Sequence, residues 1–209
     1  MDIENLAETA EDFTGNVWLL SRNSSEFRGS QKPPASRGAE TVLIDAGEGD
    51  CWQEIDELES LEKVVVTHSH HDHVDNLPKI VDRFSPGVYA YEPENLPVDA
   101  EEIEEGDTLE LSGTDFEVIQ TPGHRDDSIC LYSREEKLLF TGDLIFPEGG
   151  FGRTDLKEGD RDLLIESIEK VAELEVDEFY PGHGEAVTQD AGRWIEKSLE
   201  QAKKREPKY

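Results

Sequence analysis

Residues 63–73 read KVVVTHSHHDH, and this stretch carries most of the information about the fold of the chain. Its first half is a short apolar run rich in valine, which is typical of a buried β-strand. Imidazole and carboxylate are the usual nitrogen and oxygen ligands of zinc and similar ions. The second half holds four of the six histidines and one aspartate: His68, His70, Asp72, His73 and His71. The stretch therefore predicts a strand that leads directly into metal-ligating side chains.

Three other phrases place a His or an Asp in the same position after an apolar run. FEVIQTPGH ends at His124, LLFTGD ends at Asp143 and EFYPGH ends at His183. Ligands gather beyond the C-terminal ends of strands in open α/β sheets, so we expect these four strand ends to meet. Two ions need roughly six or seven protein ligands, and the chain offers seven candidates. They are His68, His70, Asp72, His73, His124, Asp143 and His183.

The alternative interpretation is a set of unrelated surface or capping histidines. Five of the six histidines lie in phrases compatible with metal binding, which disfavours that interpretation. His71 is the exception, and we expect its side chain to be exposed or to lie behind the ligands.

The rest of the chain predicts the short strands and amphipathic helices of a layered α/β domain. Strands are expected over 17–21, 41–46, 63–67, 116–121, 129–133, 138–141 and 178–180. Helices are expected over 50–58, 77–84, 160–174 and 192–205. In the third helix the apolar residues recur on one face, and Asp160 can cap its first turn. We expect a single domain over 1–209, with a C-terminal helix within 190–209.

The charge balance is strongly acidic, with 50 Asp and Glu against 20 Lys and Arg and a net charge of −30. This balance disfavours nucleic-acid binding through a basic surface and adhesion to anionic lipid. No apolar run approaches the roughly 20 residues of a membrane helix, and the acidic start of the chain does not resemble a signal peptide. We therefore expect a cytoplasmic protein with neither nucleic acid nor membrane as a partner, and the oligomeric state stays open.

An acidic excess of this size favours an organism with high internal salt, where screening weakens the repulsion between surface charges. The alternative is an ordinary acidic protein. The two cysteines, Cys51 and Cys130, lie in apolar patterns and predict buried thiols rather than a disulfide framework.

One segment departs from the acidic composition. Residues 22–38 carry Arg22, Arg28, Lys32 and Arg37 but a single acid, and their Pro, Ser and Gly content predicts a long surface loop. Such a loop could fold over the metal edge and attract an anionic substrate. The alternative is a solvated loop whose charges have no role.

The chain resembles the metallo-β-lactamase superfamily over about residues 16–188. THSHHDH matches the H-x-H-x-D-H signature of that family, His124, Asp143 and His183 match its remaining ligand positions in order, and LIDAG at 43–47 is similar to its preceding strand and turn. Asp75 stands where many members have glycine. The resemblance implies an αββα sandwich, the metallo-β-lactamase fold, with metals at one edge.

The same resemblance implies a ligand assignment for two divalent ions, with zinc expected first and iron or manganese as alternatives. His68, His70 and His124 would hold one ion, Asp72, His73 and His183 the other, and Asp143 would bridge them. Residues 142–160 are similar to the glyoxalase II and persulfide dioxygenase branch. Within that segment Arg153 could bind a substrate carboxylate, or it could form an ion pair with Asp155 or Asp143.

The activity implied is hydrolysis of the thioester of a small, anionic substrate by a metal-activated water, with Asp72 orienting the nucleophile. Three alternatives remain: an iron-dependent persulfide dioxygenase using His68, His124 and Asp143, another hydrolase of the superfamily, and a non-catalytic binding protein that has kept a metal site. The acyl group and the carrier thiol stay open.

Overall fold

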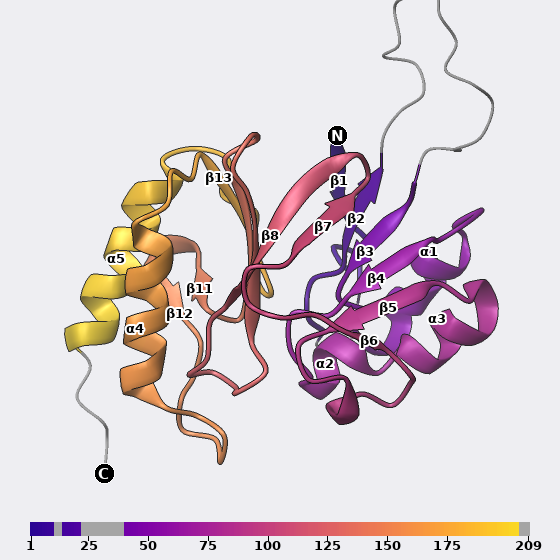
Figure 1. Ribbon diagram of the computed structural model, residues 1–209, viewed down its shortest axis with the longest axis horizontal. Coiled ribbons are helices and arrows are strands. Elements are labelled where there is room, and N and C mark those ends of the chain that lie inside the picture. Colours follow the sequence, from indigo (N-terminus) through magenta and orange to yellow (C-terminus); the bar gives the residue numbers. More distant parts are fainter. Residues whose placement is uncertain (11–13, 22–39, 205–209) are drawn as a thin grey trace, which may run out of the picture.

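The computed structural model describes residues 1–10, 14–21 and 40–204. Two β-sheets lie face to face, and helices cover the outer face of each, so the layers follow the order helix, sheet, sheet, helix (Figure 1). The expected αββα sandwich is therefore confirmed.

The first sheet has six strands in the order β1-β2-β3-β4-β5-β6. They span Asp2–Asn5, Trp18–Ser21, Val42–Ile44, Lys63–Val65, Gly87–Ala90 and Glu101–Glu102. The pairs β1–β2 and β2–β3 are antiparallel, whereas β3 to β6 run parallel. The central strands β3 and β4 consist mostly of buried Val, Leu and Ile, as expected of parallel strands that are covered on both faces.

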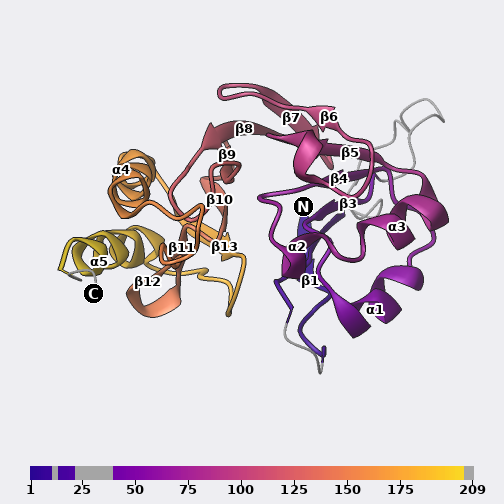
Figure 2. The same ribbon diagram turned by 90° about the horizontal axis from the view of Figure 1, so that it is seen from below.

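Two helices cover the outer face of this sheet, and a third lies at the edge where the two sheets meet (Figure 2). The bounds are η1 Gly49–Cys51, α1 Trp52–Asp56, α2 His71–Val74 and α3 Leu77–Phe84. On α3, Leu77 and Ile80 are fully buried against the sheet. The edge helix α2 begins soon after β4 ends. It therefore holds the second half of the histidine-rich stretch at the edge where the two sheets meet.

The second sheet has five strands in the order β13-β10-β9-β8-β7. The bounds are β7 Thr108–Leu111, β8 Thr114–Gln120, β9 Ile129–Ser133, β10 Leu138–Gly142 and β13 Glu178–Pro181. β9 is antiparallel to both β8 and β10, and β13 is parallel to β10. The strands β8, β10 and β13 therefore point the same way, and their C-terminal ends share one edge.

Two helices and a small ribbon complete the outer layer of the second sheet. The helices are α4 Arg161–Ala172 and α5 Ala191–Lys204, and the ribbon joins β11 Ile145–Phe146 to β12 Gly150–Phe151 through η3 Pro147–Gly149. The carboxylate of Asp160 accepts the backbone N–H groups of the first turn of α4 at 2.9 and 3.0 Å, which confirms the predicted cap. Leu164, Ile168 and Val171 are fully buried on the inner face of α4.

The space between the sheets is filled by aromatic and aliphatic side chains. The rings of Phe116 and Phe140 lie 5.7 Å apart, and Tyr180 lies 5.3 Å from Phe140. Trp18 of the first sheet meets Tyr180 of the second edge to face at 5.1 Å. These contacts join the sheets, so they fix the position of one set of strand ends relative to the other.

The predicted strands and helices are all found, with ends that differ by a few residues. The sequence prediction missed β1, β5, β6 and β7, because each has four residues or fewer and none is a continuous run of buried apolar residues. It also missed the ribbon of β11 and β12 and the short turn η2 Pro93–Asn95. The basic segment 22–38 and residues 205–209 lie outside the described residues.

Both cysteines are buried and free, as predicted. Within the described ranges, no helix combines the length and the apolar character needed to cross a membrane.

Candidate metal centre

The four strand ends identified in the sequence meet at one edge of the sandwich. His68 and His70 follow β4, His124 follows β8, Asp143 follows β10 and His183 follows β13. Three of these strands share one edge of the second sheet, and β4 reaches the same place from the first sheet. The interface between the two sheets therefore ends, at this edge, in polar side chains contributed by both sheets.

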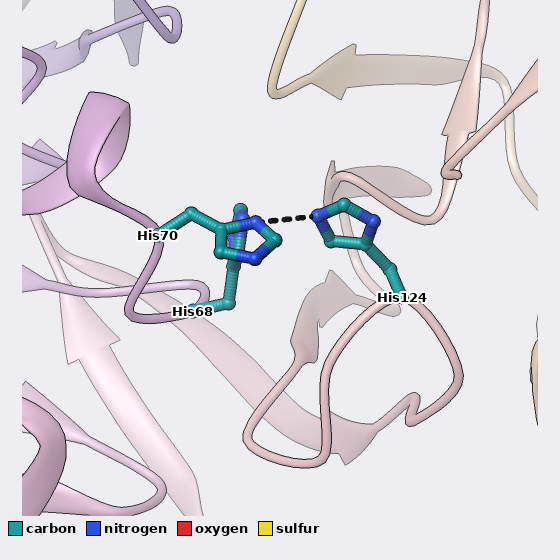
Figure 3. Close-up of side chains that lie close together, drawn as sticks. All are labelled: His68, His70 and His124. Carbon is teal, nitrogen blue, oxygen red and sulfur yellow. Dashed lines mark hydrogen bonds between the residues drawn. The ribbon is translucent and has the colours of Figure 1, made fainter. Parts of the chain in front are cut away.

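The first group consists of His68, His70 and His124. Figure 3 shows His68 and His70 on one side and His124 opposite them, with the Nδ1 atom of His70 only 2.8 Å from the Nε2 atom of His124. One nitrogen from each of the three rings lies within 4.8 Å of the other two. Such a cluster could hold one metal ion, because neutral imidazole nitrogens are good ligands and an ion would replace the hydrogen bond between His70 and His124.

The second group consists of Asp72, His73 and His183, and its ligand atoms also lie within 4.8 Å of one another. The Oδ2 atom of Asp72 is 3.1 Å from Nε2 of His183 and 3.8 Å from Nε2 of His73. Asp72 and His73 are neighbours on α2, so a single turn of helix presents both toward the strand end that carries His183.

Asp143 lies between the two groups. Its Oδ2 atom is 3.4 Å from Nε2 of His124, in the first group, and 3.6 Å from Nε2 of His183, in the second. Its Oδ1 atom is 3.5 Å from Nε2 of His73. A carboxylate in this position faces both groups at once, so the seven residues expected from the sequence form one continuous cluster.

Three buried atoms in this cluster have no hydrogen-bond partner among the described residues: Nε2 of His68, Nε2 of His73 and Oδ1 of Asp143. Buried polar atoms in native proteins are almost always paired, because leaving one unpaired is costly. The three atoms face one another, and all of them are good ligands for a divalent cation. The donor set therefore fits metal ions on chemical grounds.

The electrostatics of the cluster also favour added positive charge. Burial alone would lower the pKa of His73, but the carboxylates of Asp45 and Asp143 outweigh it and raise that pKa well above its usual value. Burial likewise opposes ionisation of Asp72, yet its bond to His183 and the charges of His73 and His183 lower its pKa to about 2. The shift of His73 shows that the carboxylates around it create a negative potential, which favours a cation, and the shift of Asp72 shows that neighbouring positive charge keeps its carboxylate ionised.

The first group is kept neutral by a different balance. Burial and the neighbouring imidazoles lower the pKa of His68 well below its usual value. Burial, His124 and Arg125 lower the pKa of His70 to about 4. Neutral rings at physiological pH are the form of histidine that binds metal.

Asp45 sets the protonation of two imidazoles, and the sequence prediction missed this role. Its Oδ2 atom accepts hydrogen bonds from Nδ1 of His73 and from the hydroxyl of Thr67, both at 2.8 Å. Because that hydroxyl donates its hydrogen to Asp45, its oxygen accepts the Nδ1–H of His68 at 3.2 Å. Nε2 is therefore the atom with which each ring would bind a metal ion, and the second proton of His73 would be released on binding. Asp45 is the third residue of the LIDAG phrase and directly follows β3, so a carboxylate at a strand end was the available signal.

The backbone holds His124 in the same way. Its Nδ1–H donates to the carbonyl oxygen of Arg153 at 2.9 Å, which leaves Nε2 to face the cluster. The side chain of Arg153 lies elsewhere: it is 60 % exposed and its guanidinium forms two hydrogen bonds with Asp155 at 2.8 and 2.9 Å. His71 is also exposed, as expected, and its ring pairs with Glu48 and Asp75.

Two glycines in the TPGH and PGHG phrases are required by close packing. A Cβ atom on Gly182 would lie 2.2 Å from Oδ1 of Asp143 and 2.9 Å from the ring of His73. A Cβ atom on Gly123, whose φ is +125°, would lie 2.2 Å from the backbone nitrogen of Leu164 at the start of α4. Only glycine lets these two turns bring their histidines so near to the neighbouring elements.

The segment before β2 connects the His183 turn to the first sheet. The side-chain amide of Asn16 donates to the carbonyl oxygens of Pro181 at 2.9 Å and Gly184 at 2.8 Å, and its backbone N–H donates to Gly182 at 2.7 Å. The indole N–H of Trp18 donates to Pro181 as well, at 2.9 Å. His183 is thereby placed by a segment that lies far away in the sequence.

Comparison with known proteins agrees with this geometry. A model of the metallo-beta-lactamase superfamily matches residues 36–183. The chain is 33% identical over 171 residues to a hydroxyacylglutathione hydrolase from Chromohalobacter salexigens, which covers 80% of this chain and 61% of that protein. It is 28% identical over 193 residues to the atrochrysone carboxyl ACP thioesterase of Aspergillus fumigatus, covering 87% of this chain and 58% of that protein. The chain thus spans about three fifths of the length of these two curated relatives.

A solved structure gives the same result for the fold. The chain superposes on the crystal structure of the BLEG-1 B3 metallo-beta-lactamase with a TM-score of 0.66 at 27% identity, covering 89% of this chain and 91% of that one. The region that matches the superfamily model, residues 36–183, contains all seven residues of the cluster. The chain therefore belongs to the metallo-beta-lactamase superfamily.

Proposed function

We propose that this protein is a metal-dependent hydrolase that cleaves the thioester of a small thiol. One observation carries the proposal: seven His and Asp side chains from four strand ends form two adjacent groups, each able to hold an ion. The two relatives are named for hydrolysis of hydroxyacylglutathione and of an acyl-carrier thioester, which supports a thioester as the substrate class.

The proposed ligand assignment follows the two groups and the carboxylate between them. His68, His70 and His124 would hold one ion, Asp72, His73 and His183 the other, and Asp143 would contact both. Zinc fits this set of imidazoles and carboxylates, and iron or manganese would also accept it. Bound there, two divalent ions would supply a water of lowered pKa and a Lewis acid for a carbonyl oxygen.

The side chains of the protein would orient the attacking water and the metal ligands. Asp72 stays ionised, because its pKa is lowered to about 2, so it can accept a hydrogen bond from the attacking water and orient it. The imidazoles of His68, His73 and His124 would not serve as general bases, because their Nδ1 atoms already donate to Thr67, Asp45 and the carbonyl oxygen of Arg153, and their Nε2 lone pairs would be taken up by the metal ions. A thiolate is a good leaving group, and the site needs no separate nucleophilic side chain.

The test is a single preparation assayed in three ways. The protein is purified at high salt, its metal content is quantified, and it is assayed for thioester hydrolysis, for oxygen uptake with a persulfide and for β-lactam hydrolysis. We expect up to two metal ions per chain and turnover of a thioester. Oxygen uptake without thioester hydrolysis would replace the proposal by the dioxygenase, and a fully loaded protein that is inert in all three assays would favour a binding protein.

We propose further that the protein works in a salt-rich cytoplasm. The support is the net charge of −30, which a chain of 209 residues carries more easily where surface charges are screened.

A further inference from the structure

A buried network adjoins the first group of ligands without belonging to it. Asp127 is only 4% exposed, and its Oδ2 atom accepts the backbone N–H of Ser69 at 3.2 Å and also the hydroxyl of Ser69. The side-chain amide of Asn95, on η2, donates to the same oxygen at 3.3 Å. Since Ser69 stands between His68 and His70, Asp127 connects the loop after β4 to the loop after β8.

The other oxygen of Asp127 holds an arginine. Nε of Arg125 donates to Oδ1 of Asp127 at 3.1 Å, and the side chain of Arg125 is 19% exposed. This bond uses only the inner nitrogen, so the two terminal nitrogens of the guanidinium have no partner among the described residues. Those two nitrogens form the planar fork that matches the two oxygens of a carboxylate.

Asp127 sets the position of this guanidinium relative to the metal ligands, because one of its oxygens accepts from Arg125 and the other from Ser69, which stands between His68 and His70. Arg125 also directly follows His124 in the chain. It is also isolated in the sequence, because no other Lys or Arg lies between Arg83 and Arg125. A lone cation at the first ligand group stands out in a protein with a net charge of −30.

We propose that Arg125, held by Asp127, binds a carboxylate of the substrate beside the first group of ligands. The proposal takes its substrate class from the proposed function and adds a positioning role for a residue outside the ligand set. An anionic substrate is repelled by the acidic surface, so a fixed cation at the site supplies the local attraction that the rest of the surface lacks. Because the fork is held before binding, little side-chain entropy is lost when the carboxylate arrives.

Binding of two matched thiols tests this without relying on turnover. 3-Mercaptopropionate and 2-mercaptoethanol both carry a thiol for the metals, and they differ in a carboxylate against a hydroxyl. Isothermal titration calorimetry with zinc-loaded protein should show a preference of about 10- to 100-fold for the carboxylate. The variant Arg125→Gln should reduce that preference to near unity while it keeps the metal content.

Three further variants make the outcome decisive. Arg83→Gln is the matched control. Arg83, on α3, also donates from Nε to an aspartate, here Asp56 of α1 at 3.0 Å. Its replacement should leave the preference for the carboxylate unchanged. Arg125→Lys keeps the charge without the fork and should lose part of the preference even if Arg125→Gln folds poorly. Loss in Arg153→Gln, with Arg125→Gln unaffected, would overturn the proposal and give the role to Arg153. No preference in the unmodified protein would overturn it as well.

Three thioesters then locate the carboxylate and separate this proposal from the proposed function. The carboxylate lies on the thiol side in S-acetyl-3-mercaptopropionate, on the acyl side in S-succinyl-2-mercaptoethanol, and is absent from S-acetyl-2-mercaptoethanol. Arg125→Gln should raise KM for one of the first two by about 10-fold or more and leave the third unchanged. If no thioester is hydrolysed but the calorimetric preference depends on Arg125, the carboxylate site stands and the proposed function fails. Equal KM values for all three in both proteins would contradict the role of Arg125 in catalysis.

Discussion

Asp45 shows how one buried carboxylate can organise a site that it does not enter. By accepting hydrogen bonds from His73 and Thr67, it fixes the tautomers of two rings and adds negative charge behind them. Partners that orient metal-binding histidines in this way typically change metal affinity by about 10- to 100-fold when they are removed. The residues that make the cluster usable are therefore more numerous than the seven that face its centre.

Asp143 is the residue on which both groups depend, and the first prediction concerns it. Asp143→Asn keeps the shape of the side chain but removes its charge and replaces one oxygen by an NH2 group, which only donates. We expect metal content and hydrolysis to fall together, with metal affinity reduced by more than about 100-fold because a direct ligand is lost. Metal quantification after dialysis measures this loss. Asp56→Asn, a change to an exposed carboxylate on α1, is the control, and full metal content in Asp143→Asn would remove the proposed bridging role.

The buried thiol of Cys130 gives a prediction about pH. Burial raises its pKa from 9.0 to about 12. Between these values the unfolded chain releases a proton that the folded protein keeps, so the thiol makes folding less favourable as the pH rises above 9. Relative to Cys130→Ala, the native protein should lose about 1.4 kcal/mol of stability per pH unit above 9. Urea unfolding at pH 8, 9 and 10 measures the difference, and a difference independent of pH would contradict the expectation.

Among the elements, the turns after β8 and β13 are more constrained than the strands that lead into them. Both turns contain a glycine because another element passes within contact distance: α4 at Gly123 and the ligand cluster at Gly182. The Pro-Gly-His phrase occurs in both turns because each needs a glycine where the neighbouring element leaves no room for a Cβ atom.

The second glycine allows a matched comparison. Gly182→Ala would place a methyl group 2.2 Å from Oδ1 of Asp143, so we expect it to displace the carboxylate and reduce metal content and activity. Gly192→Ala is the control, because a Cβ atom at Gly192 would meet nothing within 4 Å and the position lies in α5. That variant should keep its metal and gain up to about 1 kcal/mol of stability from helix propensity. Melting curves and metal quantification of both variants decide the matter, and an unperturbed Gly182→Ala would show that the cluster has room to relax.

The sequence predicted the strands that end in ligands far better than the strands at the sheet edges. The phrases before His68, His124, Asp143 and His183 are apolar and end abruptly, so both their structure and their direction could be inferred. By contrast, β1 and β6 are short and largely exposed, and their pairing depends on neighbours rather than on their own pattern.

The supporting contacts of the site could not be predicted for a related reason. The bonds from Asn16 to the His183 turn and from Asp127 to Ser69 join residues that are 165 and 58 positions apart. No local spacing encodes such contacts, and they follow only from the packing of the two sheets. At Arg153 the side chain forms the ion pair with Asp155 that was one of the two expected alternatives, whereas the contact of its backbone oxygen with His124 had no signal in the sequence.

At the scale of the whole molecule, the acidic excess is spread over the surface. Many of the lysines and arginines already lie against a carboxylate, as in Lys63–Glu40, Lys137–Glu175 and Lys203–Glu169. The exposed pairs contribute little individually, since solvent screens them. The unpaired acids remain, and their mutual repulsion opposes the compact state.

Salt should therefore stabilise the protein, and the shape of the response identifies the cause. The Debye length falls from about 10 Å at 0.1 M to about 3 Å at 1 M, so repulsion among exposed carboxylates is largely removed over that range. We expect the Tm of metal-loaded protein to rise steeply with KCl up to about 1 M and then to level off. An equal concentration of an uncharged solute such as sucrose, which stabilises by exclusion from the surface, should give a smaller and more linear rise. A Tm that stays flat in KCl, or that rises equally in both solutes, would show that repulsion among the carboxylates does not limit the stability of this fold.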